Sequence, residues 1–298
     1  MPTASTWLSK QPKFWNKDYL IEAKVGSPPQ TLSLALDTAS SDFWVFSNDT
    51  PADRIDGRVI YDPSKSSARR LDGHYWGVKY GEKAAVGGAV YWDVVSIGKI
   101  RVLKQAIQSV EMLTRSIELS MNASGVFGLA FDSRNKVQPT SKRTWFSKAK
   151  RHFQEPLFTT HLKDEAGNIT YTPVVGNTGL WRWSSTGYRI GQGPFRRRRI
   201  TGIADTGSSL MLMPERIAAE YWGQVDGANY DAATGGFTYP CGTPLPDFAF
   251  GVGKQAITVP GNMMHNMQND GIWGGPALQA AFVVWDAGRM RLGWAQAA

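Results

Sequence analysis

The sequence contains a single cysteine, Cys241, and only four histidines among its 298 residues. One cysteine excludes an intramolecular disulfide, and we expect its thiol to have no chemical role. The histidines are scattered along the chain, so the ligand spacing of a metal site is missing. The Gly-X-Ser-X-Gly signature of a nucleophile elbow and the glycine pattern of a phosphate-binding loop are missing too. We therefore expect no metal and no cofactor.

Long apolar runs are also missing. No stretch approaches the roughly 18–20 apolar residues that cross a bilayer, so we expect no membrane partner. The first residues, Met1–Trp7, show no basic segment followed by an apolar one, as a secretory signal would. Disulfides are typical of secreted proteins. These absences together favour a cytoplasmic or other intracellular location, or a secreted one if the chain is a trimmed mature form.

Charged residues are sparse, at 19%, but their signs are unbalanced. The 33 lysines and arginines against 25 acidic residues give a formal charge of +8. The densest basic run is Arg196–Arg199, which predicts either a solvated hairpin tip or a contact with an acidic substrate group. No nucleic-acid-binding motif accompanies this run. We expect no nucleic-acid partner.

The residues that are abundant indicate a mostly β protein. Hydrophobic residues make up 42% of the chain, and 31 glycines and 16 prolines are scattered among them. This texture is typical of many short strands and turns with a sizeable core. Short helices are predicted over 144–153 and, after a proline, over 214–221. Most of the 12 tryptophans are expected to pack in the core.

One short pattern occurs twice. Leu34–Leu36 leads into Asp37-Thr38-Ala39-Ser40, and Thr201–Ala204 leads into Asp205-Thr206-Gly207-Ser208. In each copy an apolar, strand-like run carries an Asp-Thr pair into a turn of small residues, and bulky apolar residues follow. The two aspartates lie 168 positions apart (205 − 37). This spacing predicts two similar halves, each of which supplies one carboxylate.

The repeated pattern resembles the two Asp-Thr-Gly motifs of pepsin-like aspartic peptidases, especially those of filamentous fungi. The resemblance covers nearly the whole chain. Gly125–Phe131 and the region from Ile272 to Asp286 resemble the apolar-glycine segments that thread the two active-site loops. The family resemblance implies a mostly β, bilobal fold with the active-site cleft between the two lobes. We expect an N-terminal lobe over 1–165 and a C-terminal lobe over 166–298.

The resemblance also implies a role for each motif residue. Asp37 and Asp205 would be the catalytic pair. Thr38 and Thr206 would brace the two loops, and Ser40 and Ser208 would stand at the carboxylate oxygens. Gly207 completes the second motif. Two neighbouring carboxyl groups cannot both ionise cheaply, so such a pair shares one proton, and one group then acts as an acid while the other acts as a base.

A lid over this site is expected from a long hairpin. Strands over 75–80 and 88–95, joined at 81–87, have the length that a lid requires. By resemblance, Tyr80 and Gly81 would belong to this flap, and Trp44 would hydrogen bond to the Tyr80 hydroxyl. The sequence departs from the family pattern in three places: Ala39 replaces the glycine of the first motif, Lys83 stands at the flap turn, and Gly275-Pro276 replaces the usual acidic residue of the second apolar-glycine segment.

Three functions remain open at this point. The leading one is an aspartic-type endopeptidase that hydrolyses peptide bonds through an activated water and acts as a monomer. In the second, the same pair catalyses cyclisation, dehydration or isomerisation of a small molecule in fungal secondary metabolism. In the third, the chain keeps the fold but only binds or inhibits. The missing secretion features, the basic charge and the altered flap motivate the second function. Lys83 would place a cation near the shared proton, and the added Cβ of Ala39 would crowd the first loop.

Overall fold

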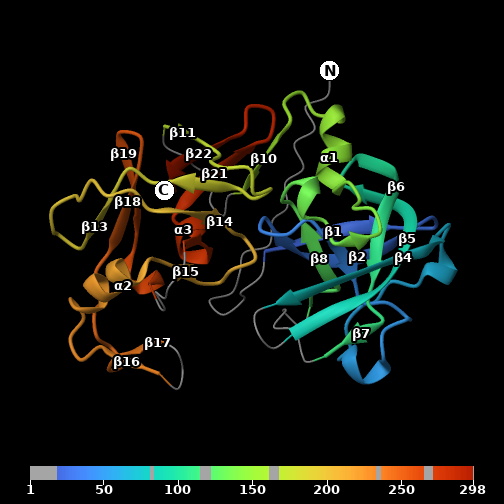
Figure 1. Cartoon of the computed structure of the whole chain (residues 1–298), viewed down its shortest axis with the longest axis horizontal. Coiled ribbons are helices and arrows are strands. Elements are labelled where there is room, and N and C mark those ends of the chain that lie inside the picture. Colours follow the sequence, from blue (N-terminus) through green and yellow to red (C-terminus); the bar gives the residue numbers. More distant parts are fainter. Residues whose placement is uncertain are drawn as a thin grey trace. The chain divides into compact units, whose positions relative to one another are not determined.

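The computed structural model describes residues 19–80, 84–114, 122–160, 168–232, 236–264 and 271–297. It divides into two compact units, Met1–Glu155 and Pro156–Ala298, each with its own sheets (Figure 1). The expected lobe boundary, between residues 165 and 166, falls outside the described residues and stays a prediction. The chain is mostly β, as expected.

The strands of the N-terminal unit are β1 (Leu20–Val25), β2 (Gln30–Asp37), β3 (Phe43–Val45), β4 (Arg69–Tyr80), β5 (Ala84–Ile97), β6 (Ile100–Ser109), β7 (Met112–Leu113), β8 (Gly125–Gly128) and β9 (Val137–Gln138). The unit combines strands with alternating burial, such as β1, with strands that are buried throughout, such as β3 and β8. Short 3-10 turns separate some of them: η1 (Ala52–Arg54), η2 (Pro63–Lys65), η3 (Asp132–Arg134) and η4 (Lys150–His152). The α-helix of this unit is α1 (Trp145–Ala149).

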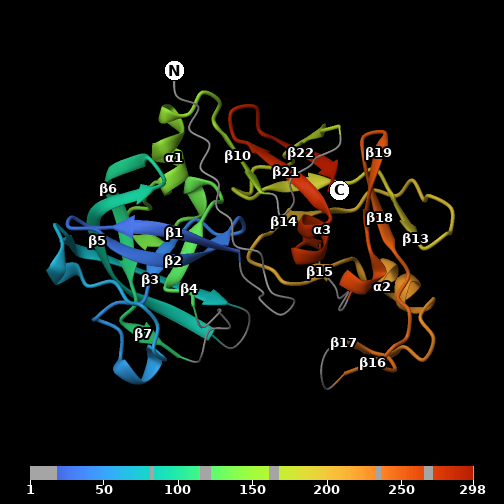
Figure 2. The same cartoon turned by 180° about the vertical axis from the view of Figure 1, so that it is seen from behind.

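These strands form a sheet with the order β1-β2-β8-β3-β6-β5-β4-β9 (Figures 1 and 2). Strand β7 pairs with β5, and the end of β1 pairs with β5 as well. The pairs β2–β8 and β3–β6 are parallel, whereas β1–β2 and β4–β5 are antiparallel. Trp44 and Trp76 stack in the core with ring centroids 6.2 Å apart. The parallel β2–β8 pair places Asp37 opposite Gly128.

The hairpin β4–β5 is longer than the sequence predicts. Residues 84–87 belong to β5 and not to the turn, so only residues 81–83, which are not described, connect the strands. Gly87 was predicted at the end of the turn and Gly88 at the start of the second strand, but both lie inside β5, where backbones approach closely. A Cβ on Gly87 would meet the Trp76 carbonyl at 2.6 Å, and one on Gly88 would meet the Ser109 carbonyl at 2.3 Å.

The predicted helix over 144–153 is shorter than expected. It consists of α1 followed directly by the 3-10 turn η4. The Thr144 hydroxyl accepts a hydrogen bond from Ser147 N–H at 3.1 Å and caps the N-terminus. Trp145, Phe146 and Ala149 are buried, and the Trp145 indole N–H donates to the Val95 carbonyl on β5. The buried face therefore fixes α1 against the sheet.

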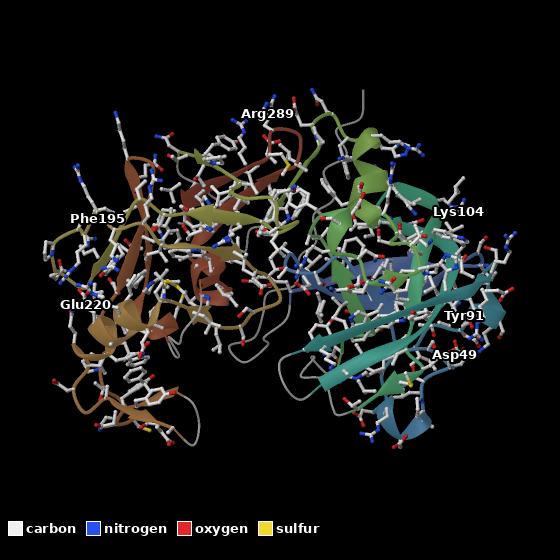
Figure 3. All side chains as sticks on the ribbon, in the orientation of Figure 1. Asp49, Tyr91, Lys104, Phe195, Glu220 and Arg289 are labelled. Carbon is white, nitrogen blue, oxygen red and sulfur yellow. The ribbon has the colours of Figure 1, made fainter. Side chains whose placement is uncertain are left out.

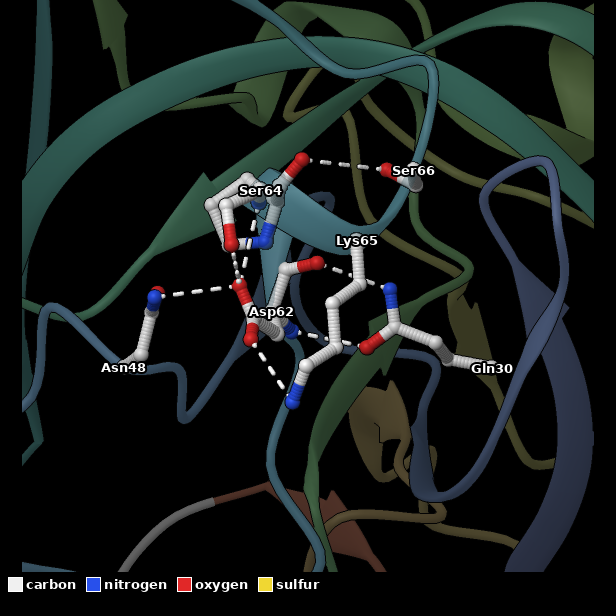
Figure 4. A network of polar contacts seen from close by, with 7 residues as sticks. Gln30, Asn48, Asp62, Ser64, Lys65 and Ser66 are labelled. Carbon is white, nitrogen blue, oxygen red and sulfur yellow. Dashed lines mark hydrogen bonds and ion pairs between the residues drawn. The ribbon is translucent and has the colours of Figure 1, made fainter.

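A polar network fixes the loop that contains η2 (Figure 4). Asp62 and Gln30 exchange two hydrogen bonds of 2.8 Å, which tie this loop to the start of β2. The Asp62 carboxylate accepts from Asn48 and Ser64, and it pairs with Lys65 at 3.1 Å. Ser64 and Lys65 are the leading causes that lower the pKa of the Asp62 carboxyl. Elsewhere on this unit, the Tyr91 hydroxyl donates to Asp49 (Figure 3).

The C-terminal unit is built from smaller sheets. Its strands are β10 (Leu157–Thr160), β11 (Thr170–Pro173), β12 (Arg182–Ser184), β13 (Tyr188–Ile190), β14 (Thr201–Ala204), β15 (Met211–Leu212), β16 (Asn229–Asp231), β17 (Gly236–Thr238), β18 (Phe248–Val252), β19 (Gln255–Val259), β20 (Ile272–Trp273), β21 (Ala281–Asp286) and β22 (Arg291–Gln296). Its helices are α2 (Glu215–Trp222), the 3-10 turn η5 (Gly261–Met263) and α3 (Gly275–Gln279). Pro214 precedes α2 as expected.

The sheets of this unit have the orders β10-β21-β22-β11, β12-β14-β20-β15, β13-β18-β19 and β16-β17. Aromatic side chains fill its core. Trp183 lies 4.9 Å from Trp273 and 4.7 Å from Trp294, measured between ring centroids. These residues, together with Trp181, Trp222 and Trp285, are almost fully buried. The prediction that most of these tryptophans serve the core is therefore confirmed.

Two sequence features lie on the surface of the C-terminal unit. Cys241 is exposed and forms no disulfide. Arg196–Arg199 is exposed and mostly irregular, and Arg196 forms an ion pair with Glu220 at 2.7 Å. Among the described residues, no helix is long and apolar enough to cross a membrane.

Candidate active site

Asp37 is the last residue of β2, where the parallel strand β8 runs beside it. Its Oδ1 accepts hydrogen bonds from the backbone N–H groups of Ala39 (2.8 Å) and Ser40 (3.2 Å). Its backbone carbonyl accepts from Leu129 N–H at 2.7 Å. The carboxyl is thus held by its own turn, and the turn is held by the segment after β8.

Gly128 allows the turn to lie this close. A Cβ at this position would meet the backbone of Ser41 and Asp42 at 2.6 Å, so any larger residue would displace the loop. Gly128 N–H also donates to the Asp42 carbonyl at 3.0 Å, and Ala130 N–H donates to the Ser40 carbonyl at 2.8 Å. The apolar-glycine segment therefore supports the Asp37 loop directly.

Asp205 has the same local setting in the C-terminal unit. It follows β14, which runs parallel to β20 with Ala204 opposite Trp273. Its N–H donates to the Trp273 carbonyl at 3.1 Å. Its Oδ1 accepts from Gly207 N–H at 2.8 Å, which matches the bond between Ala39 and Asp37 in both distance and spacing along the chain. The Asp205 residue is 8% exposed.

Gly274 takes the place in this loop that Gly128 has in the other. A Cβ on Gly274 would meet the Leu210 carbonyl at 2.0 Å and the Ser208 carbonyl at 2.7 Å. Gly275 N–H donates to the Ser208 carbonyl at 2.7 Å. The Ser208 hydroxyl donates to the Leu210 carbonyl at 3.1 Å. These bonds stabilise the loop, and the expected place of Ser208 at the carboxylate stays a prediction.

Ala39 does not strain the first loop. Apart from glycines, the described residues with positive φ are Asp56 and Met290, so Ala39 occupies a backbone region open to any L-residue. Its N–H makes the bond that Gly207 makes in the second loop. The loss of glycine from the first motif therefore leaves the local carboxyl geometry intact.

A hydrogen bond joins Trp44 on β3 to Tyr80 at the end of β4. The Trp44 indole N–H donates to the Tyr80 hydroxyl at 2.8 Å, and the two rings lie 6.5 Å apart. Burial, followed by the negative charge of Asp37, raises the pKa of the Tyr80 hydroxyl. Tyr80 therefore lies within electrostatic reach of Asp37. Gly81 and Lys83, the other flap residues, lie outside the described residues, and their roles stay predictions.

A buried carboxyl next to the Asp37 loop was missed by the sequence analysis. Asp42 is 1% exposed, and its Oδ1 accepts from Lys136 N–H (2.8 Å), Gln108 (2.9 Å) and Asn135 (3.1 Å). Burial raises the pKa of Asp42, although these hydrogen bonds oppose the effect. In the sequence, Asp42 directly precedes the bulky run Phe43–Phe46. This position does not reveal its hydrogen-bond partners.

The electrostatic state of Asp37 follows from its surroundings. Burial raises the pKa of this carboxyl, whereas the Ser40 hydroxyl and the N–H groups of Ala39 and Ser40 lower it; the net direction is upward. Thr38 and Thr206, which follow the two aspartates, are 0% and 1% exposed. The described residues contain no group of three or more His, Cys, Asp or Glu side chains that could hold a metal ion.

Comparisons with known proteins agree with this geometry. The family model of the eukaryotic aspartyl protease matches residues 18–297. Endothiapepsin from Cryphonectria parasitica is 39% identical over 302 residues, covering 90% of this chain and 72% of that protein. Aspergillopepsin-1 from Aspergillus pseudoglaucus is 36% identical over 311 residues, covering 94% and 79%.

Solved structures agree on the fold. The crystal structure of an aspartic proteinase from Irpex lacteus superimposes with a TM-score of 0.74 and covers 94% of both chains, at 20% identity. At that identity, the match bears on the fold alone.

The expected intracellular location is wrong. Fungal pepsin-like relatives such as endothiapepsin and the aspergillopepsins are secreted enzymes. The expectation gave too much weight to the missing disulfides. A chain of this length buries enough apolar surface to be stable without a cross-link, so its cysteine content does not report its compartment.

The two Asp-Thr loops, the glycines that support them and the matches over nearly the full chain lead to one conclusion. This protein belongs to the eukaryotic aspartyl protease family, whose fungal members are pepsin-like endopeptidases.

Proposed function

We propose that the protein is an endopeptidase in which Asp37 and Asp205 act as a general acid–base pair. The observation that carries this proposal is the matched setting of the two carboxyl groups. Each lies at the end of a strand that pairs in parallel with a neighbouring strand, β8 or β20. The Oδ1 of each accepts a hydrogen bond from the backbone N–H two residues ahead at 2.8 Å. An Asp-Thr turn with a purely structural role would not require the same carboxyl hydrogen bonding in both units.

The reaction needs one ionised and one protonated carboxyl group. The carboxylate takes a proton from water while its partner donates a proton to the scissile carbonyl oxygen, so water adds to the carbon without a covalent enzyme intermediate. The tetrahedral species then collapses: the C–N bond breaks, the amine nitrogen takes the proton that the base removed from water, and the deprotonated partner recovers a proton from a hydroxyl of the tetrahedral carbon. A carboxylic acid and an amine remain, and the pair is restored. The raised pKa of Asp37 supports a shared proton that persists above the ordinary titration range of aspartate.

The other motif residues are proposed to position this pair. Thr38 and Thr206 would brace the loops, since both are buried directly after the aspartates. Tyr80, held by Trp44 at 2.8 Å, would close over the peptide. The substrate is a polypeptide, as for the family's endopeptidases.

Substitution of each aspartate tests the proposal. D37N and D205N should each lower kcat/KM on a denatured-protein digest by about 10²–10⁴-fold, with the folded fraction unchanged. D72N is the matched control, because Asp72 is an exposed residue on β4, and it should keep the wild-type rate. Cleavage by D37N or D205N at the wild-type rate would exclude the pair. No cleavage by the wild type from acid to neutral pH, with no binding of pepstatin, would exclude the peptidase.

A further inference from the structure

Three lysine side chains gather around one tryptophan ring on the N-terminal unit. Lys104 on β6 and Lys148 on α1 each place their Nζ 5.0 Å from the centroid of Trp92 on β5. Lys142, which lies just before α1, places its Nζ 5.7 Å from the same centroid. We call these four residues the Trp92 cluster. They are spread over 56 positions of the chain (148 − 92), so the sequence does not reveal them as a group.

The fold holds the members of the Trp92 cluster in place. Strands β5 and β6 pair with Trp92 opposite Ala106, two positions from Lys104, so the two side chains are diagonal neighbours on one face. The Lys148 Nζ donates a hydrogen bond to the Lys104 carbonyl and joins α1 to β6. The Gln105 amide donates to the Arg143 carbonyl at 3.3 Å, which fixes the segment that carries Lys142.

The positive charge of the Trp92 cluster is only partly offset. None of its lysines forms an ion pair with another residue that the structure describes. Asp132 is the acidic group that acts on Lys148. Its carboxylate is held by Thr144 N–H (2.8 Å) and the Ser147 hydroxyl (2.7 Å), and its single charge stands against those of three lysines. The ring of Trp92 offers each ammonium a cation–π contact, but it carries no net charge.

The cations repel one another over short distances. Since all lie within 5.7 Å of one centroid, no two are further apart than about 11 Å, close to the Debye length of about 10 Å at 0.1 M salt. The pKa of Lys148 is lowered to about 8, mainly by burial. Asp132 opposes this shift, and the charges of Lys104, Arg143 and Lys142 add to it. An anion placed among these ammonium groups would relieve this repulsion.

We propose that Lys104, Lys142 and Lys148 form a binding site for a doubly charged oxyanion of the phosphate or sulfate type, with Trp92 as its floor. Several ammonium donors that converge from different elements match the several oxygens of such a group, and lysine is a common phosphate ligand. The site is independent of the proposed peptidase chemistry, because it uses none of those residues. The oxyanion is either free or carried as an ester.

Calorimetric titration of the full chain at low ionic strength tests the site. Inorganic phosphate and glycerol 3-phosphate separate the free ion from the ester, and sodium chloride at the same ionic strength corrects for screening. We expect binding of one or both phosphates beyond the chloride effect. The variant K142Q/K148Q should lose at least tenfold in affinity. The control K24Q/K254Q removes the same charge from exposed positions outside the cluster and should bind as the wild type does.

A pH series with sulfate, which stays a dianion from pH 6 to 9, gives a second readout. The charged groups that face Lys148 are Asp132, Lys104, Arg143 and Lys142. Affinity of the wild type should fall at least threefold as pH rises through about 8, because Lys148 loses its proton. K148R should bind equally at pH 7 and 9, since arginine stays charged. Equal affinities for wild type and K142Q/K148Q, or the same pH profile for K148R, would overturn the site.

Discussion

The backbone N–H of Ala39 donates to the Asp37 carboxylate at 2.8 Å, and Gly207 makes the same bond to Asp205 at the same distance. The bond depends on the backbone alone, so alanine supplies it as well as glycine does. Ala39 is not among the residues with positive φ, which removes the usual reason for glycine in a tight loop. The exchange of glycine for alanine therefore does not argue against catalysis.

A39G tests this conclusion. We expect kcat/KM to change by less than about threefold, because the hydrogen bond to Asp37 is kept. We also expect the free energy of unfolding to fall by about 0.4–1 kcal/mol, because glycine gives the unfolded chain more freedom. Peptide cleavage and guanidinium unfolding measure the two effects. A rise in kcat/KM of tenfold or more would show that Ala39 does disturb the carboxyl.

Substitution of Gly128, which supports the Asp37 loop, should have a larger effect than A39G. G128A places a Cβ 2.6 Å from the backbone of Ser41 and Asp42, so the Asp37 loop must move. We expect a loss of about 1–3 kcal/mol or more in unfolding free energy and a fall in kcat/KM of at least tenfold. G77A is the matched control on β4, because its added Cβ meets nothing closer than the Val86 carbonyl at 3.7 Å. Equal effects of the two variants on cleavage would refute the support role of Gly128.

The sequence predicted the elements of the site better than their surroundings. Both Asp-Thr loops come at the ends of predicted strands. In each half, an apolar run before a turn of small residues predicts a strand followed by a loop. The hydrogen bond between Trp44 and Tyr80 is present. In contrast, Gly87 was predicted in the turn although it lies in β5, because close backbone approach and turn chemistry both require glycine. Only the three-dimensional pairing of β4, β5 and β6 distinguishes the two.

Long-range polar partners were beyond the sequence. Asp42 bonds Gln108 and Asn135, which are 66 and 93 positions away. No local pattern marks such a network, because each member alone is an ordinary polar residue. The Trp92 cluster was hidden for the same reason, since its lysines approach one another only after the strands pair.

Asp42 should make the stability of the N-terminal unit depend on pH. Its pKa is raised above the ordinary 3.8 in the folded state, so the folded protein holds this proton more tightly than the unfolded chain. The resulting stability is fully present below the unfolded pKa and is lost as pH rises through the folded pKa. D42N keeps an Oδ1 acceptor but cannot titrate. We expect it to reduce the loss of unfolding free energy between pH 3 and 7, measured by guanidinium unfolding.

D72N serves as the control for this effect, because Asp72 is exposed on β4. It should leave the dependence of the unfolding free energy on pH as it is in the wild type. If the unfolding free energy of D42N and the wild type changed equally with pH, Asp42 would have the same pKa in the folded and unfolded states.

The two motif serines should affect the pH profile of cleavage differently. The Ser40 hydroxyl lowers the pKa of Asp37, whereas the Ser208 hydroxyl donates to the Leu210 carbonyl. In S40A the Asp37 pKa should rise further, so its proton is held to higher pH. The limb of the kcat/KM profile in which Asp37 titrates should therefore shift to higher pH. S208A should leave the pH profile unchanged. Cleavage assays from pH 2 to 7 measure both profiles. A downward shift in S40A, or an equal upward shift in S208A, would contradict the assignment of Asp37 to the reacting pair.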